Sequence, residues 1–185
     1  MRITGGQARG IPLELPKGDA VRPATDALRQ AVFSSLAARV PGARFLDLFA
    51  GSGAYGLEAL SRGAAGGVFV ENNPRTAAFI HQNITAVCKS LGRETGGLQV
   101  VNADATTVPW GAAPDLVFID PPYEIIPQVA PKLFVRLTEL LAVKPELIVV
   151  FEMPGAMELS PEGWTCLKRL GKGARQPTAC VFKSS

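Results

Sequence analysis

Short, mostly apolar runs alternate with helix-like segments from residue 43 to residue 151 of this 185-residue chain. Runs of this kind are typical of strands in a parallel sheet that is covered on both faces. Parallel strands need long crossover connections, and the intervening helix-like segments can provide them. The alternation therefore predicts an α/β fold of the Rossmann-like, doubly wound kind, with a mostly parallel sheet.

The expected elements follow from apolar periodicity and from start and stop signals. We expect parallel strands at 44–49, 67–71, 98–103, 116–119 and 147–151, and helices at 25–39, 55–62, 74–91 and 126–141. Thr25 and Asn73 suit helix caps, and Pro74 suits a first helical position. Segments 165–170 and 178–183 predict an antiparallel pair that completes a seven-stranded sheet at its C-terminal edge.

The N-terminal segment has a different pattern. Residues 1–4 and 11–15 are extended candidates around a glycine-containing connection, and they predict a hairpin or arm. We therefore divide the chain into an arm at residues 1–23, a candidate for RNA binding, and a main domain at residues 24–185.

Composition excludes several classes of protein. Hydrophobic residues at 47% and charged residues at 19% exclude a disordered or fibrous chain. No apolar run reaches the roughly 18 residues of a membrane span, and the N-terminus does not resemble a signal peptide. The three cysteines form no CxxC pair, so we expect buried, reduced thiols and no metal site. These features predict a cytoplasmic protein with no membrane contact, and we expect a monomer.

Positive charge gathers at the two ends of the chain, although the net charge is only +3. Residues 164–185 hold five basic residues and no acidic one, and the first thirty residues include Arg2, Arg9 and Arg22. Basic ends around a neutral-to-acidic body suit a polyanionic partner. A solvated face that aids solubility would explain the same distribution.

Ligand-binding residue types follow the first three strands. After Asp47, the glycines at 51, 53 and 56 are spaced as in loops that let backbone approach a ligand closely. A nicotinamide dinucleotide would use similar spacing, but Asp47 would repel its pyrophosphate. Glu71 stands where a ribose-binding acid is expected, and Asp104 suits an adenine amino group. Each acid alone also fits an ordinary strand end.

The fourth strand ends in Asp120-Pro121-Pro122-Tyr123. Asp120 and a backbone carbonyl could accept the hydrogens of an amine while Tyr123 stacks on its base, an arrangement that suits methyl transfer to a planar exocyclic amine. Asp-Pro is also an ordinary strand ending. Acids and a glycine loop after four strands are nevertheless hard to assign to packing together. They predict one crevice for an adenosine ligand and a second amine.

These motifs resemble, in this order, those of class I S-adenosylmethionine-dependent methyltransferases, and Asp-Pro-Pro-Tyr resembles the amino-methyltransferase version. The resemblance is closest to the RsmD-type 16S ribosomal RNA guanine-N2 methyltransferases. It covers roughly residues 1–152, including residues 1–6, Arg9-Gly10, residues 22–26, Arg29 and the run 47–64. The chain departs from the family pattern at Tyr55 and at residues 171–177.

The resemblance implies methylation of the N2 amine of a loop guanine in small-subunit ribosomal RNA, on an assembled or partly assembled 30S particle, with S-adenosylmethionine as cofactor and no metal. It implies Asp120, Pro121, Pro122 and Tyr123 as catalytic residues. The cofactor residues would be Asp47, Phe49, Ala50, Gly51, Ser52, Gly53, Glu71, Asn72, Asp104 and Ala105. Arg2, Arg9, Arg22 and Thr25 would bind the RNA.

Three alternatives stay open. An N6-adenine DNA methyltransferase shares Asp-Pro-Pro-Tyr, but it usually needs a further target-recognition domain. A protein glutamine methyltransferase favours Asn at position 120. A non-catalytic RNA-binding module would not need Asp47, Glu71 and Asp104 together.

We expect His81, the single histidine, on a helix surface, and Trp110 and Trp164 in the core.

Overall fold

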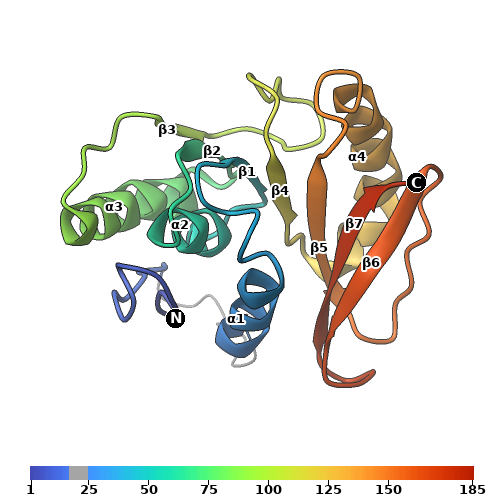
Figure 1. Ribbon diagram of the computed structural model, residues 1–185, viewed down its shortest axis with the longest axis horizontal. Coiled ribbons are helices and arrows are strands. Elements are labelled where there is room, and N and C mark those ends of the chain that lie inside the picture. Colours follow the sequence, from blue (N-terminus) through green and yellow to red (C-terminus); the bar gives the residue numbers. More distant parts are fainter. Residues whose placement is uncertain (17–24) are drawn as a thin grey trace.

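The computed structural model describes residues 1–16 and 25–185, and a seven-stranded sheet forms its centre (Figure 1). The strands are β1 (Arg44–Leu48), β2 (Gly66–Val70), β3 (Leu98–Val101), β4 (Leu116–Ile119), β5 (Ile148–Pro154), β6 (Trp164–Gly171) and β7 (Pro177–Ser184). Their spatial order is β3-β2-β1-β4-β5-β7-β6. Strands β1 to β5 are parallel, whereas β7 runs antiparallel between β5 and β6. The expected fold class is confirmed.

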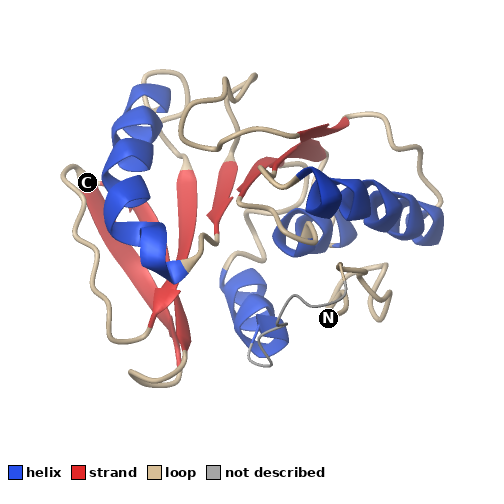
Figure 2. Cartoon of the chain, turned by 180° about the vertical axis from the view of Figure 1, so that it is seen from behind, coloured by secondary structure: helices blue, strands red, loops and turns tan. Residues whose placement is uncertain are grey.

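Helices cover both faces of the sheet. On one face lie α1 (Thr25–Ser35), α2 (Ala54–Ser61) and α3 (Pro74–Leu91), which share a buried cluster with Phe45 and Phe118 of the sheet. On the other lies α4 (Ile126–Leu140), preceded by the 3-10 turn η1 (Tyr123–Ile125) and packed in a second cluster with Val149 and Phe182 (Figure 2). Within the described ranges, no helix is long and apolar enough to cross a membrane.

Several expected boundaries differ from the structure. Helix α1 begins at Thr25 itself and ends at Ser35 instead of residue 39. Tight turns follow, since the Arg39 amide bonds to the Leu36 carbonyl, and Pro41 disfavours helical geometry at the residue before it. Strand β3 ends at Val101 instead of residue 103. Strand β5 runs on to Pro154, which places Glu152 inside it.

Three of the single-residue expectations are confirmed and one is wrong. His81 is exposed, and Trp110 and Trp164 are buried, as expected. Cys88 and Cys180 are buried, but Cys166 is exposed. That difference follows from topology, because β6 is the edge strand of the sheet and most of its residues are open to solvent.

The N-terminal segment forms a hairpin held by an isolated bridge between Arg2 and Pro12. Ile3 both donates to the Ile11 carbonyl at 2.9 Å and accepts from the Gly10 amide at 2.9 Å. Within residues 1–16 the pairing stays limited to this bridge, and Pro12 has no N–H to extend the ladder. Ile3, Ala8 and Leu13 are buried in the same cluster as α2. The described part of this arm is therefore packed on the core and does not project from it.

Glu58 of α2 joins this hairpin to the helices. Its fully buried carboxylate accepts from the Thr4 amide at 2.7 Å and the Thr4 hydroxyl at 2.8 Å. It also pairs with Arg62 at 2.8 Å and with the buried Arg29 at 3.4 Å. A buried carboxylate needs such partners to offset its desolvation, so the hairpin, α1 and α2 are held as one unit.

Candidate active site

A cavity of about 450 Å³ lies where the strand order reverses. The chain leaves β1 towards β2 and leaves β4 towards β5, although β1 and β4 are neighbours. Ligands of open α/β sheets bind at the carboxyl ends of strands at such a switch point. Of the expected site residues, the cavity lining includes Asp47, Phe49, Ala50, Gly51, Ser52, Glu71, Asn72, Asp120, Pro121 and Pro122.

The loop after β1 is held in an unusual conformation. Phe49 has a φ of 58°, the one positive value among the described non-glycine residues, and Gly51 and Gly53 follow at 54° and 78°. A non-glycine residue held there costs on the order of 1–3 kcal/mol, and such strain concentrates at functional sites. The Ala50 amide is tied to the Val70 carbonyl at 3.0 Å. This loop is thus a shaped wall of the cavity.

The glycines of this loop serve two different purposes. A Cβ at Gly51 would meet only the Phe49 carbonyl, at 4.0 Å, so its backbone is open to a ligand. A Cβ at Gly56 would lie 2.4 Å from the Phe69 ring and 2.5 Å from the Phe45 ring. Gly56 therefore lets α2 pack closely on the sheet. Gly53 is not among the lining residues either, and a Cβ there would lie 3.2 Å from the Phe69 ring, so the expectation that all three glycines serve ligand approach is corrected.

Asp47 is 2% exposed and accepts a hydrogen bond from the Gly56 amide at 2.9 Å. Burial raises the pKa of this carboxyl from 3.8 to about 8, against the lowering effect of the Gly56 bond. A nearby positive charge on a ligand would favour the ionised form. Asp47 thus fixes the start of α2. Its carboxyl group lines the cavity, and its ionisation depends on the charge of a bound ligand.

Glu71 connects the two loops that border the cavity. One carboxylate oxygen accepts from the Gly51 amide and the other from the Asn73 amide, each at 2.9 Å. Asn73 in turn caps α3, as expected, by accepting from the Arg75 and Thr76 amides. Each carboxylate oxygen has a second lone pair, so the geometry leaves acceptor capacity for hydroxyl groups of a ligand.

Asp104 and Ala105 are not among the residues that line this cavity. Asp104 is exposed and accepts from the Thr106 amide at 2.7 Å and the Thr106 hydroxyl at 2.8 Å, and these bonds lower its pKa. The Ala105 carbonyl accepts from Trp110 and Arg136. Local turn bonds thus hold this pair, and its contact with an adenine ring stays a prediction.

The Asp120–Tyr123 tetrapeptide follows β4 directly. Asp120 is half-buried and, with Pro121 and Pro122, lines the cavity. The Asp120 amide lies 3.5 Å from the Leu48 carbonyl, next to the loop after β1. Tyr123 begins η1 and packs partly buried against the α4-side cluster. The carboxylate and the rigid turn are therefore at the cavity, with the aromatic ring just beyond its lining.

Several lining residues were not expected in the site from the sequence, and the polar ones Arg29, Tyr55 and Glu152 are among them. The Tyr55 hydroxyl donates to Glu152 at 2.8 Å, and its ring stacks on Phe118 at 5.3 Å between centroids. Glu152 is 2% exposed. It follows an apolar run, as Asp120 does, so the same signal could have found it.

Asn83 of α3 ties the glycine loop to the N-terminal segment. Its amide nitrogen donates to the Ser52 carbonyl at 2.9 Å and to the Glu14 carbonyl at 3.0 Å, while its oxygen accepts from the Glu14 amide at 2.8 Å. Met1 and Leu15 also line the cavity. The hairpin therefore borders the mouth of the site.

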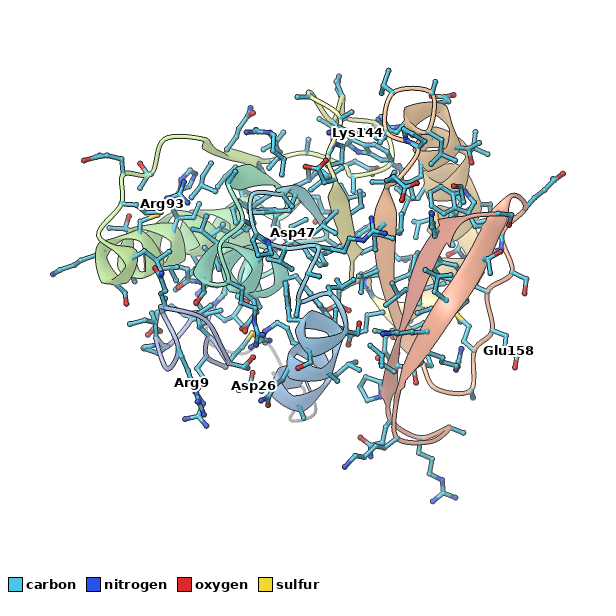
Figure 3. All side chains as sticks on the ribbon, viewed as in Figure 1. Arg9, Asp26, Asp47, Arg93, Lys144 and Glu158 are labelled. Carbon is cyan, nitrogen blue, oxygen red and sulfur yellow. The ribbon has the colours of Figure 1, made fainter. Side chains whose placement is uncertain are left out.

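The residues expected to bind RNA differ in how much the structure describes of them and in their exposure. Arg2 and Arg9 are exposed, and the Arg9 side chain points away from the body of the molecule (Figure 3). Arg22 lies outside the described residues, and Thr25 is described only as the first residue of α1. Of the C-terminal basic residues, Arg169 donates to the Gly155 and Met157 carbonyls, both at 2.8 Å.

Comparison with known proteins gives consistent matches. The family model described as Conserved hypothetical protein 95 matches residues 1–180. Ribosomal RNA small subunit methyltransferase D of Escherichia coli K12 is 39% identical over 125 residues, which are 66% of this chain and 60% of that protein. The protein of the same name from Haemophilus influenzae is 31% identical over 176 residues, 94% of this chain and 89% of its own. The alignment thus spans under two thirds of the Escherichia coli relative.

Solved structures share the fold over the whole chain. A putative methyltransferase, yhhF, from Escherichia coli superposes with a TM-score of 0.76 and 32% identity, covering 100% of this chain and 98% of that one. A putative RNA methyltransferase from Pyrococcus horikoshii, at 17% identity and a TM-score of 0.65, covers 93% of each chain and shows the fold alone.

Proposed function

This chain belongs to the family described as Conserved hypothetical protein 95, the RsmD-type family, and on that premise we propose that it is an S-adenosylmethionine-dependent ribosomal RNA methyltransferase. Its target in this proposal is the N2 amine of a guanine in small-subunit ribosomal RNA. The substrate is an assembled or partly assembled 30S particle in the cytoplasm, on which a single chain acts.

One observation supports this proposal most strongly. The glycine loop after β1 and the Asp120-Pro121-Pro122 turn after β4 line the same cavity, although they lie far apart in sequence. A cofactor loop and an amine-binding carboxylate must meet for a methyl group to pass between two ligands. The cavity volume also falls within the roughly 300–1,000 Å³ of small-molecule sites.

The residues on the cofactor side fit S-adenosylmethionine. This cofactor supplies a methyl group on a positively charged sulfur. The backbone at Gly51 is open to a close ligand, Glu71 offers acceptor oxygens to ribose hydroxyls, and Asp47 offers a carboxyl to an ammonium group. In this proposal, Asp104 and Ala105 hold the adenine ring at the outer end of the site.

On the acceptor side, the Asp120 carboxylate and the Pro121 carbonyl accept hydrogen bonds from the two N–H groups of the guanine amine. The amine nitrogen then pyramidalises and its lone pair turns towards the methyl group, so alignment provides much of the rate. As the new N–C bond forms and the S–C bond breaks, the nitrogen loses one proton, which the Asp120 carboxylate accepts. Tyr123 stacks on the base, a contact worth roughly 1–3 kcal/mol in single-stranded nucleic acid complexes. The base must leave its stack, which favours a loop nucleotide over a duplex.

Asp120→Ala tests the proposal. Transfer should be abolished while calorimetric affinity for the cofactor stays within about twofold, because Asp120 serves the acceptor amine. Asp120→Asn should also fail, since its amide presents one acceptor and a donor. The assay is single-turnover methylation of small subunits purified from a strain that lacks the enzyme, followed by mass spectrometry of the RNA.

Glu158→Ala, a change at an exposed acid far from the cavity, is the control (Figure 3). Near-normal methylation by Asp120→Ala would contradict the proposed mechanism. A methylated product other than guanine N2 would contradict the proposed target.

A further inference from the structure

A second carboxylate lies beside Asp120, and the mechanism above does not use it. Strands β4 and β5 are parallel, and their paired register ends with Ile119 opposite Phe151. Continuing that register by one residue places Asp120, which follows β4, next to Glu152 of β5. Residues opposite each other on neighbouring strands project to the same face of the sheet. Both residues line the cavity. The site therefore presents two adjacent carboxylates to its acceptor end.

The Glu152 side chain is oriented by Tyr55. The Tyr55 hydroxyl donates to one Glu152 oxygen at 2.8 Å, and the Tyr55 ring is fixed by stacking on Phe118. Burial, and then the charges of Glu152 and Asp120, raise the pKa of Tyr55 well above its ordinary value, so the hydroxyl keeps the proton that it donates. A buried carboxylate is costly to maintain unless it is hydrogen-bonded, and the Tyr55 hydroxyl provides such a bond at the cavity wall.

Guanine is the standard base whose ring N–H adjoins an exocyclic amine. Its N1–H and N2 amine lie side by side on one edge and match two adjacent acceptors. Adenine and cytosine present a ring nitrogen lone pair beside the amine. That lone pair is an acceptor, so it would face the second carboxylate with no hydrogen bond possible between them. Sites built to hydrogen-bond a substrate group reject analogues that lack that group far more strongly than apolar pockets do.

We propose that Glu152 determines base specificity by accepting the N1–H of guanine, with Tyr55 as its positioning residue. This inference rests on the proposed function and deepens it, because it assigns the recognition of the base edge next to the reacting amine. No proton is transferred in this contact. Glu152 acts by binding and alignment, and Asp120 keeps its role at the amine.

The test compares guanine with 2-aminopurine at the target nucleotide of a reconstituted particle. 2-Aminopurine keeps the amine at C2 but has no hydrogen on N1. Wild type, Glu152→Gln, Glu152→Ala and Tyr55→Phe are assayed for kcat/KM on both substrates, with Glu158→Gln as the control for a distant exposed acid. Calorimetry with S-adenosylhomocysteine and thermal unfolding report cofactor binding and folding for every variant.

Wild type should prefer guanine by about 10- to 150-fold or more, the factor expected for one hydrogen bond to a charged group. Glu152→Ala should be slower on guanine by a similar factor and little changed on 2-aminopurine, so that the preference disappears. Tyr55→Phe should fall between wild type and Glu152→Ala, since the carboxylate remains but is less well oriented. Cofactor affinity should be unchanged in all of the Glu152 and Tyr55 variants.

Two results would overturn the assignment. An unchanged preference for guanine in both Glu152 variants would show that Glu152 does not contact N1–H. A large drop in cofactor affinity in the isosteric Glu152→Gln protein would place Glu152 on the cofactor side. Failure of the wild type to methylate guanine would instead contradict the proposed function, and the wild-type arm alone reveals it.

Discussion

At the scale of single residues, the cavity depends on carboxyl groups whose surroundings differ. Asp47 is buried and Asp104 is exposed, and the pKa of the first is raised while that of the second is lowered. Glu71 is held by two backbone amides, and Glu152 by a tyrosine hydroxyl. The carboxyl groups in and around this site therefore have different roles. Asp47 titrates, Glu71 holds two loops together, and Glu152 is an oriented hydrogen-bond acceptor.

The pKa of Asp47 predicts how stability depends on pH. Between pH 3.8 and about 8 the folded protein keeps a proton that the unfolded chain releases, so raising the pH in this window destabilises the folded state. The change approaches about 1.4 kcal/mol per pH unit and levels off above the folded pKa. Asp47→Asn keeps an acceptor for the Gly56 amide but does not titrate.

Urea unfolding of wild type and Asp47→Asn from pH 5 to pH 9 measures this effect. The stability of wild type relative to Asp47→Asn should fall as pH rises to about 8 and then stay constant. Parallel stability curves for the two proteins across this range would show that Asp47 is ionised in the folded state at all of these pH values.

Glu71→Ala should weaken cofactor binding, because it removes the expected ribose acceptor and the clamp on Gly51 and Asn73. Each charge-assisted hydrogen bond that is removed is worth roughly 1.5–3 kcal/mol before water compensates. Calorimetric titration with S-adenosylmethionine measures the change, with Glu94→Ala, an exposed acid, as the control. Unchanged affinity in Glu71→Ala would refute the ribose assignment.

At the scale of the elements, the position of α2 depends on how closely it approaches the sheet. The helix follows the glycine loop, carries Tyr55 and Glu58, and rests at Gly56 against the rings of Phe45 and Phe69. A side chain at position 56 would separate helix and sheet. That shift would move the cavity wall as well as the core.

Gly56→Ala should therefore destabilise the protein by about 1–3 kcal/mol, the usual cost of overpacking a core. Gly96→Ala is the matched control, because a Cβ there would meet nothing within 4 Å. Chemical denaturation of both variants gives the difference in free energy of unfolding. Equal stability of the two variants would show that the Phe45 and Phe69 rings can move aside without cost.

At the scale of the whole molecule, two basic surfaces lie on different sides of the cavity. The N-terminal hairpin borders the cavity through Met1 and carries the exposed Arg2 and Arg9. Lys168, Lys172 and Arg175 are exposed on the β6–β7 hairpin, which extends at the other side of the molecule (Figure 1). The N-terminal hairpin is the nearer candidate for positioning RNA over the site.

Arg9→Ala should weaken RNA binding and leave cofactor affinity unchanged, because Arg9 points away from the cavity into solvent. If Arg9 neutralises one phosphate of single-stranded RNA, the slope of log affinity against log salt should flatten by about 0.7. Filter binding across a salt series measures the slope. Arg39→Ala is a suitable control, since this exposed arginine lies beside Glu146 near the amino ends of β4 and β5, whereas the cavity is at the carboxyl ends of the strands. Wild-type affinity and slope in Arg9→Ala would assign docking to the proteins of the substrate particle.

The sequence by itself determined the order of the elements, because apolar periodicity, glycine turns and the Asn73–Pro74 start signal are local properties. It also located the residues after β1, β2 and β4 that line the cavity, since parallel strands bring their carboxyl ends to one edge. Only the tertiary structure decided which of those residues meet. Asp104 is held by its own turn, Gly56 packs the core, and the N-terminal hairpin is buried against α2 through Glu58. The neighbouring places of Asp120 and Glu152 arise from strand register between distant segments, which no local pattern encodes.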